Sequence, residues 1–353
     1  MTGGNMHEPF QTPIPTQWIG PIRVSGNVIG NEEVEVPLAT YETPLWPSVK
    51  RGSKISRMVE GGIRATLVDD RMTRSVYFEA PDAGAAHRVA RELDARRDDL
   101  QAVVSQASRF AKLIDLHFQY AGNLLYVRFD FTTGDASGHN MVTLAADNLM
   151  PWILQEYPEL EYGSISGNFC SDKKPTAVNG ILGRGKNVVT EIVIPRDVVV
   201  RHLKTTPEQV ADLNVRKNLI GTNLAGGLRA ANAHYANMLL AFYLATGQDA
   251  ANIVEGSQGV TTAEVRDGDL YFSCNLPNLI VGTVGNGKGA GLTVVEDNLQ
   301  KLGCREDREP GANAHRLAVL CAASVLCGEL SLMAAQTNPG ELMAAHVKIE
   351  RNQ

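Results

Sequence analysis

The chain has 353 residues, of which 44% are apolar and 20% are charged, and its formal net charge is −6. This composition is typical of a soluble globular protein, and the length allows two domains or one domain with a large insertion. The acidic balance comes without a basic stripe, which argues against a nucleic-acid-binding protein.

No targeting signal is expected, because residues 1–18 contain neither a charged segment nor an apolar run of the kind found in signal peptides. The most apolar stretch, 317–335, is interrupted by Gly328 and Glu329, and we expect it to fall short of a membrane span. Five cysteines form no CxxC pair, which argues against a zinc site and a disulfide framework. We therefore predict a soluble, cytoplasmic protein with reduced thiols.

The first half of the chain predicts a small domain inserted into a larger one. Residues 1–75 are rich in proline, glycine and β-branched residues, and the alternation over 33–36 predicts a strand. Beyond Ser75, the patterns predict strands at 76–78, 124–129 and 162–166, and helices at 85–106 and 141–157. This order indicates a split-βαβ unit covering 76–164.

The second half returns to larger elements, which we expect to join residues 1–75 in one helix-rich domain of 1–75 and 165–353. The predicted elements are a strand at 188–193, a helix at 206–213 capped by Thr206, a long helix at 225–247 and a helix at 314–335. The predicted fold class is therefore α/β (α+β), with one large domain and one small inserted domain.

The segment 166–175 concentrates charge in an unusual way. Asp172, Lys173 and Lys174 are adjacent and precede Pro175, and a glycine-rich run, 183–186, follows shortly afterwards. Two neighbouring lysines repel each other, so one of them is easily given a lower pKa or an anionic partner. A charged run of this kind taken alone is most often a solvated turn.

The whole stretch 166–186 closely resembles the substrate loop of class I 3-hydroxy-3-methylglutaryl-CoA (HMG-CoA) reductases. Further motifs of that family appear in the same order: Val36–Glu42 resembles VPMATTE, Lys50–Gly52 resembles NRG, Met72–Arg74 matches MTR, Asn232–Asn237 matches NAHxxN, Gly247–Ala251 matches GQDAA, and Gly328–Ala335 followed by His346 resembles the closing pattern. The resemblance extends from about Pro13 to His346, and this co-linearity is more specific than any single motif.

Each matched residue also has an ordinary interpretation. Glu42 alone would be a surface acid, Asp249 a polar helix cap, and His346 a core histidine. The resemblance instead implies four catalytic residues. Lys173 would stabilise the oxyanion of the thioester, Glu42 would protonate an aldehyde, Asp249 would couple their protonation, and His346 would protonate the departing CoA thiolate.

The resemblance also implies a substrate site and a cofactor site. Arg51 would lie near CoA, and Arg74 would bind the carboxylate or carbonyl region of the substrate. The other implied substrate-binding residues are Ser166, Asp172, Lys174, His234 and Asn237. The implied cofactor-binding residues are Ser108, Arg109, Phe110, Asp135, Ser137, Gly138, His139, Asn140, Gly282, Thr283, Val284 and Gly285.

The hydroxyl of Ser108 and the guanidinium of Arg109 together suit a 2′-phosphate, which favours NADPH over NADH. No GxGxxG follows a strand in a βαβ context, so a Rossmann-type dehydrogenase is not supported, and no metal is implied. The small domain would then be a ferredoxin-like NADP-binding domain. Two glycine-rich loops, Gly134–Met141 and Gly282–Gly289, differ from the family's pattern. Ser137 and His139 stand in the first loop where the family has methionines, and Asn286 and Lys288 alter the second. Near the C-terminus, Ala345 replaces a serine of the family.

The function expected from this resemblance is reduction of HMG-CoA to mevalonate and CoA, in the mevalonate pathway of isoprenoid biosynthesis. We also expect a homodimer or higher homo-oligomer with active sites shared between subunits. The family's ENVIG dimer motif is missing, because Met6–Phe10 occupies its place. The alternative is a paralogue that binds CoA thioesters without reducing them, which the altered glycine-rich loops would allow.

Overall fold

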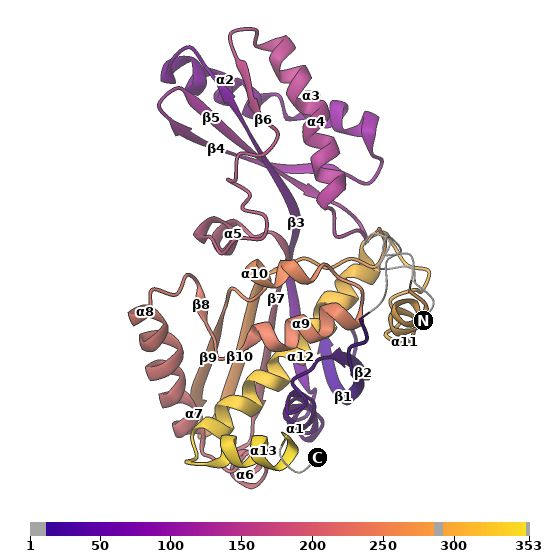
Figure 1. Ribbon diagram of the computed structural model, residues 1–353, viewed down its shortest axis with the longest axis vertical. Helices are drawn as coiled ribbons and strands as arrows, with labels where there is room; N and C mark the ends of the chain where they lie inside the picture. Colours follow the sequence, from indigo (N-terminus) through magenta and orange to yellow (C-terminus); the bar gives the residue numbers. More distant parts are fainter. Residues whose placement is uncertain (1–11, 286–291, 351–353) are drawn as a thin grey trace, which may run out of the picture.

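A computed structural model describes residues 12–285 and 292–350, with side chains left undescribed at 345, 346 and 348–350. Met6–Phe10, Asn286 and Lys288, which were singled out above, therefore lie outside the described residues, as does the side chain of His346. Figure 1 shows a larger body and a smaller body joined by the long strand β3 (Ile63–Glu79).

Strands and helices alternate along the chain in both bodies. The other strands are β1 (Thr16–Gly26), β2 (Glu32–Ala39), β4 (Lys112–Ala121), β5 (Leu124–Thr132), β6 (Glu161–Ser164), β7 (Gly185–Ile194), β8 (Ala230–Ala231), β9 (Gly259–Arg266) and β10 (Asp269–Leu279). The helices are α1 (Leu45–Met58), α2 (Ala83–Ala95), α3 (Arg97–Ala107), α4 (His139–Glu156), α5 (Ala177–Leu182), α6 (Arg196–Val198), α7 (Pro207–Leu213), α8 (Thr222–Leu224), α9 (Tyr235–Ala245), α10 (Ile253–Gly256), α11 (Thr293–Lys301), α12 (Ala312–Gln336) and α13 (Glu341–Glu350). Two π-helical segments, η1 (Val199–Leu203) and η2 (Asn214–Gly221), extend α6 and α7, and a 3₁₀ turn, η3 (Ala250–Asn252), precedes α10.

The large body is built on a mixed sheet with the strand order β2-β1-β3-β7-β10-β9-β8. The pairs β1–β3 and β8–β9 are parallel, and the other neighbours are antiparallel. Helices α9 and α12 lie across this sheet, and α1 packs beside α12 (Figure 1). The mixed α/β character expected from the sequence is therefore confirmed.

In the small body, the strand order is β4-β5-β3-β6, and every neighbouring pair is antiparallel. Each body has its own hydrophobic cluster. Phe78, Phe129 and Phe131 are fully buried in the small body, whereas Tyr235 and Phe272 are fully buried in the large one. Because β3 passes through both clusters, it links the two bodies covalently and by hydrogen bonds, and the segment between β6 and β7 joins them a second time.

Helix α12 corrects one expectation. Among the described residues, it alone is long and apolar enough to cross a membrane by length and composition, so neither Gly328 nor Glu329 interrupts it. Gly328 packs closely against Met238 of α9, because a Cβ there would lie 2.5 Å from the Met238 Sδ and the methionine would have to shift. The most apolar window of this helix is 94% buried inside the protein, which makes α12 the central core helix of the large body.

The expected single helix over 85–106 is wrong, because the chain breaks at Arg96 between α2 and α3. Arg96 has φ −110° and ψ 34°, and its side chain leaves the helix axis to pair with Asp99 and Glu156. Its guanidinium also lies 4.6 Å from the centroid of the Trp152 ring. These contacts of Arg96 offset part of the free energy that is lost when the helix is interrupted. Asp99 lies in the first turn of α3, where a negative charge stabilises the start of a helix.

The expected helix over 225–247 begins only at Tyr235. Gly226 has φ +70° and Arg229 has φ +53°, which end the preceding helical run. Residues 230–231 then form β8, and Asn232 donates to the carbonyls of Ser257 and Gly259. The propensity of the small residues for helix is therefore overridden by tertiary hydrogen bonds.

Other sequence expectations are confirmed with shifted ends. Thr206 caps α7 through a reciprocal capping box with Gln209. The helices expected at 141–157 and 314–335 correspond to α4 and α12. All five cysteines are free and buried.

Asp70 ties β3 to two other elements of the large body. Its carboxylate contacts Lys186 Nζ of β7 at 3.1 Å and His315 Nε2 of α12 at 2.8 Å. Burial pushes the pKa of Asp70 upward, but Lys186 and His315 outweigh burial and hold it at about 2. Asp70 is therefore a charged clamp between three elements.

We expect Asp70→Asn to lower the free energy of unfolding at pH 7 by roughly 2 kcal/mol, the equivalent of the pKa shift. The folded-state pKa lies below the ordinary value of 3.8, so this stabilisation is present above pH 3.8 and is lost as the pH falls toward 2. Urea unfolding at several pH values measures the difference. Asp212→Asn, which removes an exposed ion pair with Arg216, is the control and should have little effect. A difference that persists unchanged at the lowest pH would contradict the assignment.

Candidate active site

The loop that follows β6 is held in an unusual conformation. Asn168, Ser171 and Lys173 have φ values of 58°, 49° and 56°, in the left-handed region that non-glycine residues rarely occupy. Ser171 Oγ donates to the Asn168 carbonyl at 2.7 Å, and Asn179 Nδ2 donates to the Ser171 carbonyl at 3.0 Å. Strained backbone of this kind persists where surrounding contacts impose it, and it is common at functional sites.

Lys173 and Asp249 form the central ion pair of this region. Lys173 Nζ lies 2.8 Å from Asp249 Oδ2, and both side chains are partly exposed. The hydrogen bond to Asp249 raises the pKa of Lys173. Burial works to raise the pKa of Asp249, but the hydrogen bond from Lys173 and the backbone N–H of Ala251 outweigh it and lower the pKa. At neutral pH the pair is therefore an ammonium and a carboxylate.

A second ion pair lies beneath the first. Arg184 Nη1 contacts Glu255 Oε1 at 2.7 Å, and Arg184 Nη2 contacts Asp172 Oδ1 at 3.0 Å. Glu255 Oε1 also accepts the backbone N–H of Lys173 at 3.1 Å. Burial raises the pKa of Glu255 in spite of Arg184.

His139 faces the same group of charges from the start of α4. Its Nε2 lies 3.3 Å from Asn252 Oδ1 and 3.6 Å from Asp172 Oδ1. Burial lowers the pKa of His139, and the positive charge of Arg184 acts in the same direction. The imidazole is therefore more readily neutral than that of an ordinary surface histidine.

These residues line one open cleft of about 560 Å³ between the two bodies. Of the expected site residues, the lining contains Arg74, Ser137, Gly138, His139, Asn140, Asp172, Lys173, Asp249 and Gly285. Thr73, Ala136, Met141, Val142, Thr143 and Arg184 complete it. Arg74 is fixed by its Nε, which donates to the Ile165 carbonyl at 2.9 Å. Ser166 is exposed on the loop, and Lys174 Nζ contacts the Asp172 carbonyl at 3.1 Å.

The two glycine-rich loops lie against each other at the edge of this cleft. The backbone N–H groups of Thr283 and Val284 donate to the Asp135 carbonyl, and Ala136 and Val284 form a parallel bridge. A Cβ at Gly282 would lie 2.2 Å from the backbone nitrogen of Ser137, so only glycine permits this approach. The Asp135 carboxylate accepts the backbone N–H groups of Gly311 and Ala314 and so caps α12.

The loop between α3 and β4 brings the other expected cofactor residues close to the first glycine loop. The Ser108 hydroxyl accepts the backbone N–H groups of Phe110 and Ala111, and the Arg109 guanidinium lies 4.7 Å from the centroid of the Phe110 ring. A Cβ at Gly134 would contact the Phe110 ring at 4.0 Å. Arg109 is exposed and has no carboxylate partner within hydrogen-bonding distance among the described residues, so its charge is available to a ligand.

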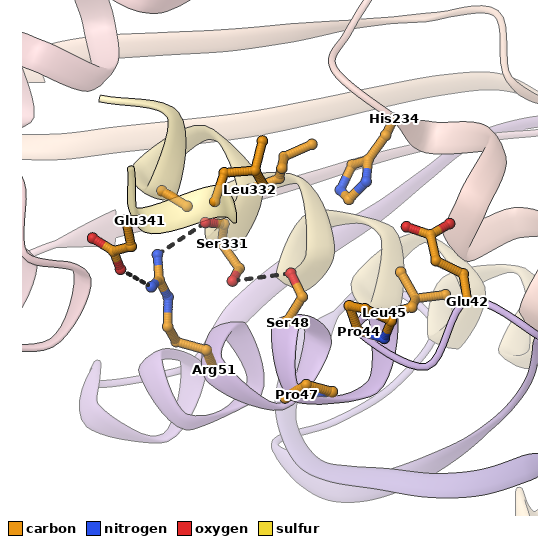
Figure 2. Close-up of a pocket in the computed structure, with 12 residues that line it drawn as sticks. Glu42, Pro44, Leu45, Pro47, Ser48, Arg51, His234, Ser331, Leu332 and Glu341 are labelled. Atoms are coloured by element: carbon orange, nitrogen blue, oxygen red, sulfur yellow. Dashed lines mark hydrogen bonds and ion pairs between the residues drawn. The ribbon is translucent and has the colours of Figure 1, made fainter. Parts of the chain in front are cut away.

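Glu42 lies in a different pocket, of about 250 Å³, shown in Figure 2. Glu42 and His234 lie at one end of this pocket, and Arg51 pairs with Glu341 of α13 at the other end at 2.9 Å (Figure 2). Asn237 Nδ2 donates to Glu42 Oε2 at 3.0 Å. Within residues 12–285 and 292–350, no hydrogen bond or ion pair joins Glu42 to Lys173 or Asp249.

His234 is the residue before α9, and a buried carboxylate fixes its backbone. Glu329 of α12 accepts the backbone N–H groups of Ala233 and His234 and the hydroxyl of Thr261. The half-buried Lys217 lies near Glu329, and burial lowers its pKa. Sequence reasoning gave no role in the site to Glu255 or Lys217, and it treated Glu329 only as an interruption of an apolar stretch and as part of the closing motif. The available signal was an acid or a base isolated within an apolar run, such as Ile253-Val254-Glu255.

His346 belongs to α13 by its backbone, and its side chain lies outside the described residues. Among the described residues, no group of three or more His, Cys, Asp and Glu side chains is arranged to hold a metal ion. The chemistry available in the described cleft is therefore that of a cation beside a carboxylate, with glycine-rich backbone at its edge.

The match to a family is clear from sequence. The family model described as hydroxymethylglutaryl-coenzyme A reductase matches residues 9–351. The HMG-CoA reductase of Pyrococcus horikoshii is 46% identical over 326 residues, which are 91% of this chain and 78% of that protein. The Aeropyrum pernix reductase is 42% identical over 352 residues, which are 99% of this chain and 82% of that protein. The chain belongs to the HMG-CoA reductase family.

Solved structures agree with this at the level of the fold. The class II HMG-CoA reductase of Streptococcus pneumoniae bound to NADPH in open conformations has a TM-score of 0.74 to this chain. The two are 18% identical, and the alignment covers 95% of this chain and 88% of that one. The overall fold is therefore shared with a distant reductase.

We expect Asp249→Asn to lower the pKa of Lys173, because the variant removes the carboxylate whose hydrogen bond raises it. Labelling with an amine-specific reagent over a pH series, read by peptide mass spectrometry, measures this pKa. The midpoint for Lys173 should move to lower pH, while Lys174 serves as the internal control. An unchanged midpoint for Lys173 would mean that the ion pair does not form in solution.

Proposed function

We propose that this chain is a 3-hydroxy-3-methylglutaryl-CoA reductase that converts HMG-CoA to mevalonate and CoA with two molecules of NADPH. The observation that carries the proposal is the Lys173–Asp249 ion pair in a cleft that the Asp172-Lys173-Lys174 loop and a glycine-rich loop both line. The enzyme acts in the mevalonate pathway of isoprenoid biosynthesis, as its family membership indicates. We place it in the cytoplasm.

We infer that residues 76–164 form a ferredoxin-like, split-βαβ cofactor domain inserted into a large domain of 1–75 and 165–353. The separate hydrophobic clusters and the antiparallel order β4-β5-β3-β6 support this division. The proposed boundary at Ser75 falls inside β3, so the two domains would share a strand.

The cleft suits NADPH, which supplies a hydride when bound. Gly138, with φ +97°, begins α4 as its N-cap, and backbone at a helix N-terminus suits an anionic phosphate. Gly282 brings the second loop against the first, and Arg109 offers an exposed cation for a 2′-phosphate. A class II relative from Streptococcus pneumoniae was solved with NADPH bound.

The residues would act on the two reduction steps in turn. Lys173 stabilises negative charge on the thioester oxygen during the first hydride transfer, a contribution of about 3–4 kcal/mol for comparable oxyanion donors. His346 protonates the CoA thiolate when the hemithioacetal collapses. Glu42 protonates the aldehyde oxygen in the second transfer, and Asp249 keeps Lys173 charged.

The separation of Glu42 from Lys173 leads us to propose a homodimer in which each active site takes Lys173 and Asp249 from one subunit and Glu42 from the other. The pocket that Glu42 lines contains neither Lys173 nor Asp249, and the cleft that Lys173 and Asp249 line does not contain Glu42. Large apolar side chains on η2 and α8, and just after α8, are exposed to water in the single chain: Val215, Leu219, Ile220, Leu224 and Leu228. Such a contiguous apolar stripe suits a subunit interface.

The alternative is a paralogue that binds CoA thioesters without reducing them. It was motivated by Ser137 and His139 in place of methionines, yet both residues line the cleft without blocking it. Absorbance at the nicotinamide band separates the two functions: HMG-CoA added to protein and NADPH should consume two NADPH per thioester. Binding of HMG-CoA without NADPH consumption would instead establish the paralogue.

Co-expression of two inactive variants tests the shared site. We expect Lys173→Ala and Glu42→Gln each to abolish thioester reduction alone, but their heterodimers to retain one intact site of two. Random pairing then restores roughly a quarter of wild-type activity. The control mixture combines Lys173→Ala with Asp249→Asn. Because both residues of a site come from the same subunit in the proposed dimer, each site of such a heterodimer carries one of the two changes, and activity should not return. Complete inactivity of the first mixture, with heterodimers verified, would place all these residues in a single subunit.

NADPH should be preferred over NADH, with Arg109 as the main cause. A charge-assisted hydrogen bond from the guanidinium to the 2′-phosphate contributes about 1.5–3 kcal/mol. Arg109→Ala should therefore raise the KM for NADPH by roughly ten- to a hundredfold and leave that for NADH nearly unchanged. Arg88→Ala, which removes an exposed arginine paired with Glu159, is the control. The prediction is wrong if the wild-type enzyme uses NADH as well as NADPH.

A further inference from the structure

The Lys173 loop is held from below by a buried ion pair that the proposed reaction steps do not use. The side chain of Arg184 is 3% exposed and that of Glu255 is 0% exposed. A buried pair of charges is costly to desolvate, so it is weak evidence for a contribution to stability. Its position directly under Lys173 requires another explanation.

The Glu255 carboxylate reaches the backbone of Lys173 itself. Its Oε1 accepts both Arg184 Nη1, at 2.7 Å, and the Lys173 N–H, at 3.1 Å. Lys173 has φ +56°, a conformation that a lysine adopts only when its surroundings impose it. The bond from the Lys173 N–H to a fixed carboxylate is such a constraint, and it aims the side chain at Asp249.

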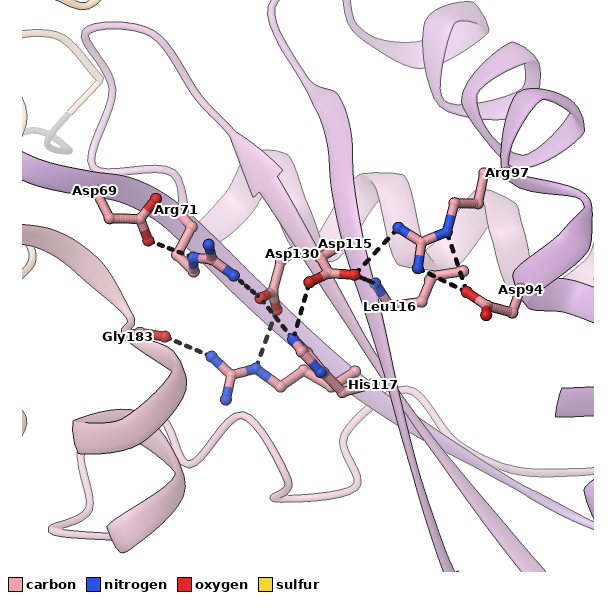
Figure 3. Close-up of polar contacts among 10 residues, drawn as sticks. Asp69, Arg71, Asp94, Arg97, Asp115, Leu116, His117, Asp130 and Gly183 are labelled. Carbon is pink, nitrogen blue, oxygen red and sulfur yellow. Dashed lines mark hydrogen bonds and ion pairs between the residues drawn. The ribbon is translucent and has the colours of Figure 1, made fainter. Parts of the chain in front are cut away.

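Arg184 extends this support to the residue before Lys173 and to the small body. Its Nη2 contacts Asp172 Oδ1 at 3.0 Å. The preceding residue, Gly183, accepts a hydrogen bond through its carbonyl from the fully buried Arg128 of β5. Arg128 is in turn held by Asp130, which also binds Arg71 of β3 and is drawn with Gly183 in Figure 3.

We propose that Arg184 and Glu255 are positioning residues for Lys173: their buried ion pair fixes the turn that carries the lysine and thereby the place where its ammonium meets Asp249. The proposal rests on the proposed function, since it assigns the pair a role in the same reaction. Neither side chain contacts the reacting atoms. Their effect on catalysis passes through the backbone of residues 172–173.

The test separates positioning from stability by replacing the pair in two ways. Glu255→Leu alone leaves the buried Arg184 with only the partly exposed Asp172 as a carboxylate partner, and it should lower both the melting temperature and kcat. The double variant Arg184→Met/Glu255→Leu has no unpaired buried charge, so its melting temperature should recover toward that of the wild type. Its kcat should nevertheless stay lower by about a hundredfold, because a misplacement of about 1 Å costs that much. The KM for NADPH should change by less than about threefold.

A conservative variant and a matched control complete the design. Glu255→Gln keeps a carbonyl oxygen for the Lys173 N–H, so its kcat should lie well above that of Glu255→Leu. Arg316 and Glu32 form an ion pair outside the cleft that joins a mostly buried arginine to a partly exposed glutamate, with Nη2 and Oε2 2.8 Å apart. Arg316→Met/Glu32→Leu should leave kcat unchanged.

The pH response of Lys173 provides a measurement that does not depend on activity. The ionisable groups that act on Lys173 are Asp172, Asp249, Glu255 and His139. The Glu255 charge itself raises the pKa of Lys173, so the comparison is between Glu255→Leu and Glu255→Gln, which both remove that charge while only the first removes the acceptor for the Lys173 N–H. If the turn shifts and the contact with Asp249 is lost, the midpoint of Lys173 labelling should lie at lower pH in Glu255→Leu than in Glu255→Gln. Recovery of wild-type kcat together with the melting temperature in the double variant, or the same labelling midpoint in the two single variants, would overturn the proposal. If the wild type proves unable to reduce HMG-CoA, the proposed function fails, and the labelling midpoint still decides whether the pair positions Lys173.

Discussion

The whole arrangement depends on the continuity of β3, which belongs to both sheets. Its residues up to Arg71 pair with β7, and from Met72 onward they pair with β5, so the partner strand changes between adjacent residues. The two partners diverge at that point, and Thr73 and Arg74 line the cleft that opens between them. The position of the cleft is thus set by the residue at which β3 changes its partner strand. A slip of β3 by one residue would turn each of its side chains to the opposite face of the sheet.

Two buried carboxylates hold the functional turns of this molecule in parallel ways. Glu255 accepts the N–H of Lys173, and Glu329 accepts those of Ala233 and His234. Each acid comes from a helix of the large body, and each accepts backbone N–H groups of a turn. The side chains proposed to meet the substrate are polar and at least partly exposed, whereas these two carboxylates are fully buried. This division explains how residues that are partly exposed, such as Lys173, can be placed accurately.

The sequence was sufficient for features that depend on neighbouring residues and on the family's motifs. The Thr206 cap, the strand around Glu33–Val36 and the meeting of the Asp172–Lys174 loop with Asp249 could all be expected. The start of α9 could not, because Leu228–Ala231 consists of good helix formers, and it is the pairing of β8 with β9 and the contacts of Glu329 that give the residues before Tyr235 another conformation. Glu255 stands out in the sequence only as an acid after two apolar residues, and its contacts are with two residues more than seventy positions away in the chain. Tertiary hydrogen bonds of that range carry no local periodicity.

The burial of every cysteine has a consequence for the redox behaviour of the protein. The proposed reaction releases coenzyme A, a thiol whose disulfides could exchange with protein thiols. Exchange requires a thiol that is both accessible and ionised. Burial raises the pKa of Cys304 to about 12 and those of Cys274, Cys321 and Cys327 as well, while Cys170 is enclosed within the substrate loop. The buried thiols of the folded chain are therefore poorly placed to exchange with oxidised coenzyme A in its surroundings.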